Sequence, residues 1–208
     1  MQNYVITIAR GFGSGGKWIA TKLSQELGIP CYDRQLLTMA SEQSGIDESV
    51  FVEVNEKLRG GYLTNLLMKV PYSTVIEATE KEFVSNINLY NIQADIIREL
   101  AKTESCIIVG KCADHILRDR KNIISIYVEA PRDSCVASIV EKMHVSEEHA
   151  NNLIKKTDKY RSNYYKYYTK GKIWTNPINY DLTLNTARIG RENCIGLIKD
   201  YINIKFQD

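Results

Sequence analysis

The sequence lacks paired cysteines, a long apolar run and a strong net charge of either sign. Its five cysteines are odd in number and include no C-x-x-C pair, which argues against a disulfide framework and a zinc site. We expect reduced thiols, as in a cytoplasmic protein. No apolar run approaches the roughly 20 residues that span a membrane, and residues 1–9 do not resemble a signal peptide. These absences predict a soluble, intracellular protein with no membrane partner.

The net charge of +2 gives no reason to expect a nucleic-acid partner from bulk electrostatics. Apolar residues make up 44% of the chain and charged residues 25%, which are ordinary values for a globular protein. A chain of 208 residues can build one good core, so we expect a single domain over residues 1–208 that carries an insertion. A binding site for anions must then come from a local group of basic residues.

A short apolar strand, residues 5–9, runs into a glycine-rich segment that opens a helix. Glycines let the backbone turn tightly and bring its N–H groups close to a polyphosphate, and the start of the helix adds a partial positive charge. Lys17 would add a mobile cation. This context predicts a phosphate-binding loop rather than an ordinary strand-to-helix turn. The candidate phosphate-binding residues are Gly11, Gly13, Ser14, Gly15, Gly16 and Lys17.

The loop can be aligned with nucleotide-binding loops in two ways. In the first alignment, Gly11, Gly16 and Lys17 fit G-x-x-x-x-G-K, but Trp18 stands where the full motif has the Ser or Thr that holds magnesium. The magnesium ligand is therefore missing. In the second alignment, residues 13–15 overlay the Gly-Ser-Gly that precedes the lysine of nucleotide kinases. Gly16 then takes the lysine position and Lys17 the hydroxyl position. The sequence leaves both alignments open.

The rest of the chain alternates predicted helices with buried strands. We expect the first helix to end near Leu27, because Gly28 is a natural C-terminal cap. Apolar runs at 106–109 and 123–128 predict parallel strands, and residues 180–185 predict a further strand. This alternation predicts an α/β fold with a mainly parallel sheet. Two more helices are expected, at about residues 87–101 and at the end of the chain, where Ile195, Leu197, Ile198 and Ile202 would be buried.

Three separate segments are expected to meet at one edge of this sheet, because ligands of such sheets bind beyond the carboxyl ends of the strands. They are the glycine loop, Gly110-Lys111 and Ala130-Pro131. Asp33 has two interpretations: it caps the helix that follows it, or it lies beside the acceptor substrate with Arg34. We interpret residues 45–84 as a helical insertion over the nucleotide site.

Residues 155–172 carry seven Lys or Arg residues, one acid and five interleaved tyrosines. On a helix, Lys155, Lys159, Lys166 and Lys170 share one face, and Tyr160, Tyr164, Tyr167 and Tyr168 cluster roughly opposite. Three interpretations compete: a solvated charged face, a nucleic-acid surface on which tyrosines stack with bases, and a lid that brings cations to a transferring phosphoryl group. The phosphate loop favours the lid, and the near-neutral net charge argues against nucleic acid.

Five segments carry a family resemblance: FGSGGK at 12–17, GIPCYDR at 28–34, IVGKCAD at 108–114, DKYR…YYKYY at 158–168 and NYDL at 179–182. In this order they resemble the cytidylate kinase-like proteins of bacteria, which are related to cytidylate kinase among the nucleoside monophosphate kinases. The resemblance implies a P-loop NTPase fold: a mainly parallel sheet flanked by helices, with a helical acceptor-binding insertion at about 33–85 and a helical lid at about 146–172.

The resemblance also implies an activity, the ATP-dependent transfer of a phosphoryl group to a nucleoside monophosphate, with CMP or dCMP favoured. The acceptor-binding residues would be Asp33, Arg34, Lys111 and Asp114. The catalytic residues would be Lys17, Arg161, Lys159 and Lys166. Mg²⁺ is expected to accompany ATP without an assigned protein ligand, and the chain would act as a monomer or homodimer. The alternative is a nucleotide-binding regulatory protein with little or no catalysis.

Overall fold

The computed structural model describes residues 3–33, 35–36, 39–40 and 80–206, with the backbone alone for residues 80–89. The chain divides into two compact units, one formed by residues 1–33 and 100–208 and the other by residues 34–99. The first unit carries the sheet and the glycine loop. In the second, the described residues include helical turns at 35–36 and 39–40 and most of α5 (Glu80–Thr103). Most of the predicted insertion, and Arg34, lie outside the described residues.

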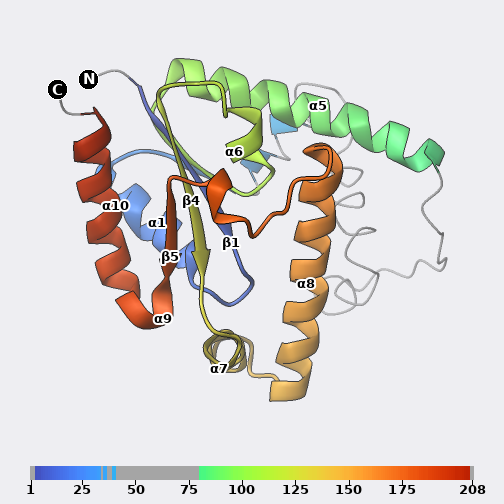
Figure 1. Cartoon of the computed structure of the whole chain (residues 1–208), viewed down its shortest axis with the longest axis vertical. Coiled ribbons are helices and arrows are strands. Elements are labelled where there is room, and N and C mark those ends of the chain that lie inside the picture. Colours follow the sequence, from blue (N-terminus) through green and yellow to red (C-terminus); the bar gives the residue numbers. More distant parts are fainter. Residues whose placement is uncertain (1–2, 34, 37–38, 41–79, 207–208) are drawn as a thin grey trace. The chain divides into compact units, whose positions relative to one another are not determined.

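Five parallel strands form one sheet in the order β2-β3-β1-β4-β5, and Figure 1 shows β1, β4 and β5 running the same way. The strands are β1 (Val5–Arg10), β2 (Cys31–Tyr32), β3 (Cys106–Val109), β4 (Ile123–Glu129) and β5 (Leu182–Asn185). The central strand β1 pairs with β3 and β4, so that Ile6 faces Ile107 on one side and Ile124 on the other. This confirms the predicted parallel sheet. The last strand begins at Leu182 rather than Tyr180, because the N–H of Tyr180 closes a 3₁₀ turn on Pro177.

Two helices, α1 (Gly16–Leu27) and α10 (Arg191–Phe206), pack side by side on one face of this sheet (Figure 1). Alternate residues of β1 point toward them, since Ile6 and Ile8 are fully buried in the same cluster as residues of both helices. Burial of each such side chain contributes about 1.5–3 kcal/mol. The helix residues of the cluster include Ile19, Ala20, Leu23, Cys194, Ile195, Ile198 and Ile202.

Helices α1 and α10 can be compared directly with the expectations from the sequence. Helix α1 ends at Leu27, and Gly28 has the left-handed φ of 64° that a C-terminal glycine cap requires. In α10, three of the four expected positions are buried, but Leu197 is exposed, so that prediction was wrong. Leu197 stands two residues after Ile195, about 200° round the helix, and therefore points the other way.

The remaining described helices of the first unit are α6 (Ala113–Ile116), α7 (Arg132–Met143), α8 (Glu147–Tyr168), the 3₁₀ turn η1 (Pro177–Asn179) and α9 (Thr186–Ile189). Helix α8 coincides with most of the predicted lid and packs against α7. Ser146 caps it, since its hydroxyl accepts a hydrogen bond from the N–H of His149 at 3.2 Å. Among the described residues, no helix combines the length and apolarity needed to cross a membrane.

Candidate phosphate-binding site

The glycine loop joins the end of β1 to the start of α1. Gly13 and Gly15 both have a φ of 88°, a left-handed conformation that side chains disfavour. Ser14 between them is buried, and its hydroxyl donates a hydrogen bond to the carbonyl of Gly11 at 2.9 Å. Its own carbonyl accepts one from the hydroxyl of Thr186 at 2.7 Å. The hydroxyl and the carbonyl of Ser14 therefore both make hydrogen bonds within the protein that hold the loop in place. The hydroxyl does not face a ligand.

The loop presents a row of open backbone donors. In the part of the chain that the structure describes, no hydrogen-bond acceptor lies opposite the backbone N–H of Gly13, Gly15, Gly16 or Lys17. Such groups need a partner, and successive N–H groups at the start of a helix form a concave site for an anion. Helix α1 adds the partial positive charge of its N-terminus. This geometry suits a polyphosphate.

Helices α7 and α10 lie close to two glycines of the loop. A Cβ on Gly13 would lie 2.7 Å from the carbonyl oxygen of Cys135 in α7, and a Cβ on Gly15 would lie 2.7 Å from Nε of Arg191 in α10. The guanidinium of Arg191 also donates a hydrogen bond to the hydroxyl of Ser138 at 3.0 Å. The loop is thus packed between the beginnings of α7 and α10, and side chains at these glycines would displace it.

A carboxylate and several cations meet beside the loop. Lys17 Nζ lies 3.1 Å from one oxygen of Asp33, and the Arg10 guanidinium lies 3.6 Å from the other. Burial alone would raise the pKa of Asp33, but the charges of Arg10, Lys17 and Lys111 lower it overall. The structure therefore brings together three of the predicted site residues. The sequence analysis did not single out Arg10, although its position at the last residue of a buried strand, directly before the loop, was a usable signal.

Arg161 of α8 contacts the loop's backbone. Its guanidinium donates hydrogen bonds to the carbonyl of Arg10 at 2.8 Å and to Asp158 at 3.2 Å, and it lies 5.7 Å from the ring centroid of Phe12. The same Asp158 oxygen accepts a hydrogen bond from the N–H of Phe12 at 2.9 Å. Asp158, which the sequence analysis passed over, therefore links α8 to the loop. One turn of α8 therefore holds the backbone at the junction between β1 and the glycine loop.

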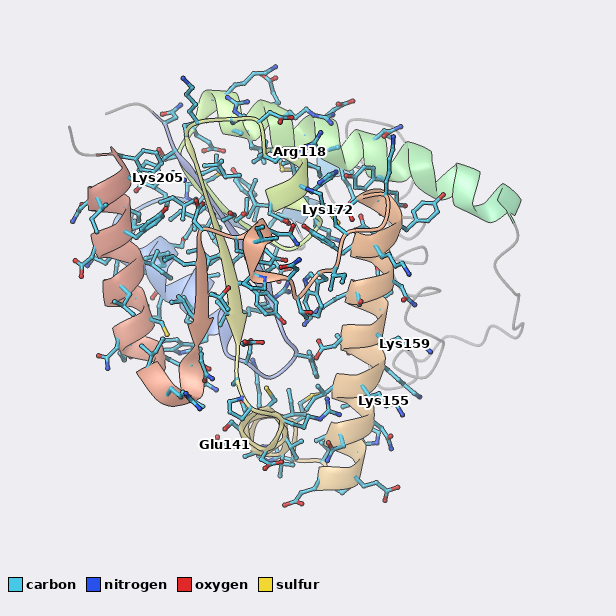
Figure 2. All side chains as sticks on the ribbon, viewed as in Figure 1. Arg118, Glu141, Lys155, Lys159, Lys172 and Lys205 are labelled. Atoms are coloured by element: carbon cyan, nitrogen blue, oxygen red, sulfur yellow. The ribbon has the colours of Figure 1, made fainter. Side chains whose placement is uncertain are left out.

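Lys159 and Lys166 do not join Arg161 at the loop. They stand two residues before it and five residues after it, and α-helical geometry places them about 160° and 140° away from it round the helix. Both are exposed, and Figure 2 shows Lys159 and Lys155 on the side of α8 away from the sheet. The predicted tyrosine cluster is confirmed, since the ring centroids of Tyr160 and Tyr164 are 5.9 Å apart and those of Tyr164 and Tyr168 are 4.6 Å apart.

The segment after β3 is unusual in its backbone. Gly110, Lys111 and Cys112 have φ values of 76°, 58° and 55°, so two non-glycine residues in succession are left-handed. Strain of this kind, about 1–3 kcal/mol per residue, is commonly kept at functional sites. The turn places Lys111 close enough to Asp33 to lower the pKa of that carboxyl. Lys111 is thus held at the edge predicted for the acceptor.

Asp114 lies behind this turn and is buried. The hydroxyl of Tyr165 in α8 donates a hydrogen bond to its carboxylate at 2.7 Å. Burial raises the pKa of Asp114 to about 6, although hydrogen bonds from Tyr165 and the backbone and the charge of Lys172 act in the opposite direction. Figure 2 shows Lys172 between the end of α8 and α6. Asp114 therefore links α6 to α8, directly after the turn that carries Lys111.

Asp114 gives a prediction on stability and pH. Its pKa is about 6 in the folded protein against an ordinary 3.8, so the folded state binds more protons between these values. Relative to Asp114→Asn, the wild type should lose stability as pH rises from about 4 to about 6, by up to about 3 kcal/mol. Urea unfolding of both proteins between pH 4 and pH 8 measures this difference. A difference that does not change with pH would contradict the raised pKa.

A comparison with protein-family models decides the family. The model of the cytidylate kinase-like family matches residues 5–188. The chain belongs to the cytidylate kinase-like family. The match runs from the first residue of β1 into α9, so it includes the glycine loop, the turn with Lys111 and helix α8. No curated protein matches the sequence significantly.

Solved structures agree on the fold of this cytidylate kinase-like chain. An uncharacterized protein from Eubacterium ventriosum is 26% identical, with a TM-score of 0.70 over 97% of this chain and 99% of that one. Shikimate kinase from Bacteroides thetaiotaomicron is 11% identical, with a TM-score of 0.53 over 96% and 98% of the two chains. Shikimate kinase from Acinetobacter baumannii, solved with shikimate, is 10% identical, with a TM-score of 0.52 over 99% and 96%. The fold is that of the P-loop kinases.

Proposed function

We propose that this cytidylate kinase-like protein transfers the γ-phosphoryl group of ATP to a nucleoside monophosphate, with CMP or dCMP as the favoured acceptor. The family supports kinase-type phosphoryl transfer. The observation that carries the proposal is the row of open amides from Gly13 to Lys17 at the start of α1, with a group of cations beside it. The five free cysteines are compatible with work in a reducing cytoplasm.

The loop would hold the donor. Amides at the start of α1 surround the inner phosphates, and Lys17, which is mostly exposed, has the reach to leave Asp33 for a phosphate oxygen. The acceptor phosphate would approach from the side of Lys111 and Asp33, with Arg34 as a further contact. Positioning and charge neutralisation are the main contributions that a protein makes to such a transfer.

The transfer itself needs no covalent intermediate. A phosphate oxygen of the acceptor attacks the γ-phosphorus, the bond from that phosphorus to the bridging oxygen breaks, and ADP leaves with the electron pair. The attacking oxygen of a monophosphate already carries negative charge, so no side chain has to remove a proton from it. The cations at the sheet edge offset the charges that must come together.

The described residues do not fit a magnesium site built by the protein. Trp18 stands in place of a hydroxyl after Lys17, and the described part of the chain contains no group of three acidic, His or Cys side chains that could hold a metal. Asp33 is already bound to two cations. Magnesium would have to come with the nucleotide, coordinated by phosphate oxygens and water.

A coupled assay of ADP release, run with each nucleoside monophosphate in turn, tests the proposal. We expect CMP or dCMP to stimulate ADP release above the rate with ATP alone. The missing hydroxyl after Lys17 favours a second candidate, a nucleotide-binding regulatory protein without turnover. ATP binding that no monophosphate converts into ADP release would contradict the kinase proposal and support the regulatory one.

A further inference from the structure

Arg10 occupies the space that a side chain at Gly16 would need. A Cβ on Gly16 would lie 2.7 Å from Cβ of Arg10 and 3.4 Å from its Cδ. The stem of Arg10 therefore runs directly across the first residue of α1. A glycine at position 16 is what lets it pass, because any larger residue would collide with the stem close to the backbone.

The guanidinium of Arg10 ends at the carboxyl edge of three strands. It extends from the last residue of β1 to within 3.0 Å of the Cβ position of Gly110, after β3, and to 3.6 Å from Asp33, after β2. Its side chain is 16% exposed, so the stem is packed while part of the group remains accessible. Asp33 orients the guanidinium. A cation is thus fixed between the donor loop and the side predicted for the acceptor.

Position 16 has a special meaning in the second alignment of the loop, where it is the lysine position of nucleotide kinases. The chain has glycine there and an arginine side chain lying across it. We propose that Arg10 replaces the loop lysine and binds the terminal phosphate of the nucleoside triphosphate. This inference rests on the proposed function and names the cation that serves the transferring phosphoryl group.

The position of Arg10 explains why it would bind the terminal phosphate rather than an inner one. The open amides lie along the loop and the start of α1, where they surround the inner phosphates. Arg10 lies beyond them, toward Gly110, Lys111 and Asp33, where the group in transit would sit. A guanidinium can bind two phosphate oxygens in its plane, whereas lysine offers a point charge. Asp33 holds that plane in place before the nucleotide arrives, which reduces the cost of ordering it on binding.

The test compares the affinities for a non-hydrolysable ATP analogue and for ADP, by calorimetry. In Arg10→Gln, the neutral side chain keeps the packing on Gly16 but lacks the charge. We expect the preference for the ATP analogue over ADP to disappear, the affinity for ADP to stay within about threefold, and kcat/KM to fall by at least about 100-fold. Arg10→Lys should recover part of the loss. Equal losses of affinity for both nucleotides would assign Arg10 a merely structural role and overturn the proposal.

A relocation variant tests the equivalence of the two positions. Arg10→Gly combined with Gly16→Lys removes the colliding Cβ and puts a lysine at the start of α1. It should recover at least about tenfold in kcat/KM over Arg10→Gly alone. A double variant that folds like the wild type yet shows no recovery would overturn the equivalence.

Arg118→Ala is the control, because Figure 2 shows this arginine near α6, at the opposite end of β4 from α7. It should leave both nucleotide affinities unchanged. A wild-type chain that binds no ATP analogue, or releases no ADP with any monophosphate, would contradict the proposed function. A wild type that does both, with an Arg10→Gln variant that keeps its preference for the ATP analogue, would contradict the role of Arg10 alone.

Discussion

Gly13→Ala is expected to lower the free energy of unfolding by about 3 kcal/mol and to weaken ATP binding at least about tenfold. Two causes add. A left-handed φ of 88° costs a side chain about 1–2 kcal/mol, and the new Cβ would lie 2.7 Å from a backbone oxygen of α7, which cannot move without shifting the helix. The loop must therefore change shape, and the row of amides with it. Urea unfolding and calorimetry with an ATP analogue measure the two effects.

Gly28→Ala is the matched control for this variant. Gly28 is also left-handed, with a φ of 64°, but nothing lies within 4 Å of its Cβ position, and it caps the far end of α1. We expect a loss of about 1 kcal/mol from the backbone alone and an unchanged affinity for ATP. Equal losses of stability in the two variants would show that contact with α7 does not restrict the loop.

The second large effect concerns the ion pair between Asp158 and Arg161. Their side chains are 29% and 17% exposed, and both also bind the backbone at the entry to the loop. Asp158→Ala removes the carboxylate that pairs with Arg161 and that accepts the hydrogen bond from Phe12 N–H. We expect each single alanine variant to lose about 2–3 kcal/mol of stability. A double-mutant cycle should give a coupling energy of about 1–2 kcal/mol.

Helix α5 supplies the comparison. Asp95 and Arg98 form a pair with the same i, i+3 spacing, but their side chains are 67% and 51% exposed. Exposed pairs in helices are worth about 0.3–0.5 kcal/mol, so the same cycle there should give a much smaller coupling. If the two cycles agree, the link from α8 to the loop contributes no more than a surface contact. Arg161 would then have no structural role at the loop, and only its predicted contact with the transferring phosphoryl group would remain.

The glycine loop and its surroundings could be predicted from the sequence because short sequence patterns determine them. Apolar runs predict parallel strands, a glycine predicts the end of α1, and strand polarity places the loop and Lys111 at one edge. The position of Arg10 before the loop made it a candidate, but its proposed role could not be predicted from the sequence, since that role depends on the space left by Gly16, which only the folded chain shows. Asp158 was hidden for a similar reason, because its partners lie 146 and 3 residues away and only one of them is local.

Helix geometry alone gives the relative angular positions of residues on one helix. The family resemblance implies Lys159 and Lys166 as catalytic residues beside Arg161, and that role stays a prediction. A separation of two residues already turns a side chain about 200° round a helix. Leu197 was expected on the buried face of α10 together with Ile195, which stands two residues before it, and is exposed. In both helices the residue numbers give the angular positions of the side chains relative to one another. They do not show which face of the helix meets the sheet.

The hydrogen bond from Thr186 to the carbonyl of Ser14 spans 172 residues, and this has a consequence during synthesis. The ribosome synthesises the loop long before the residue that anchors it. A nascent chain that has emerged only as far as β4 contains every glycine of the loop but neither Thr186 nor the start of α10. Contacts of such long separation form late in folding. The emerging chain should therefore acquire its affinity for nucleotides only after Thr186 and the start of α10 have emerged, and ATP should not bind the loop before that point.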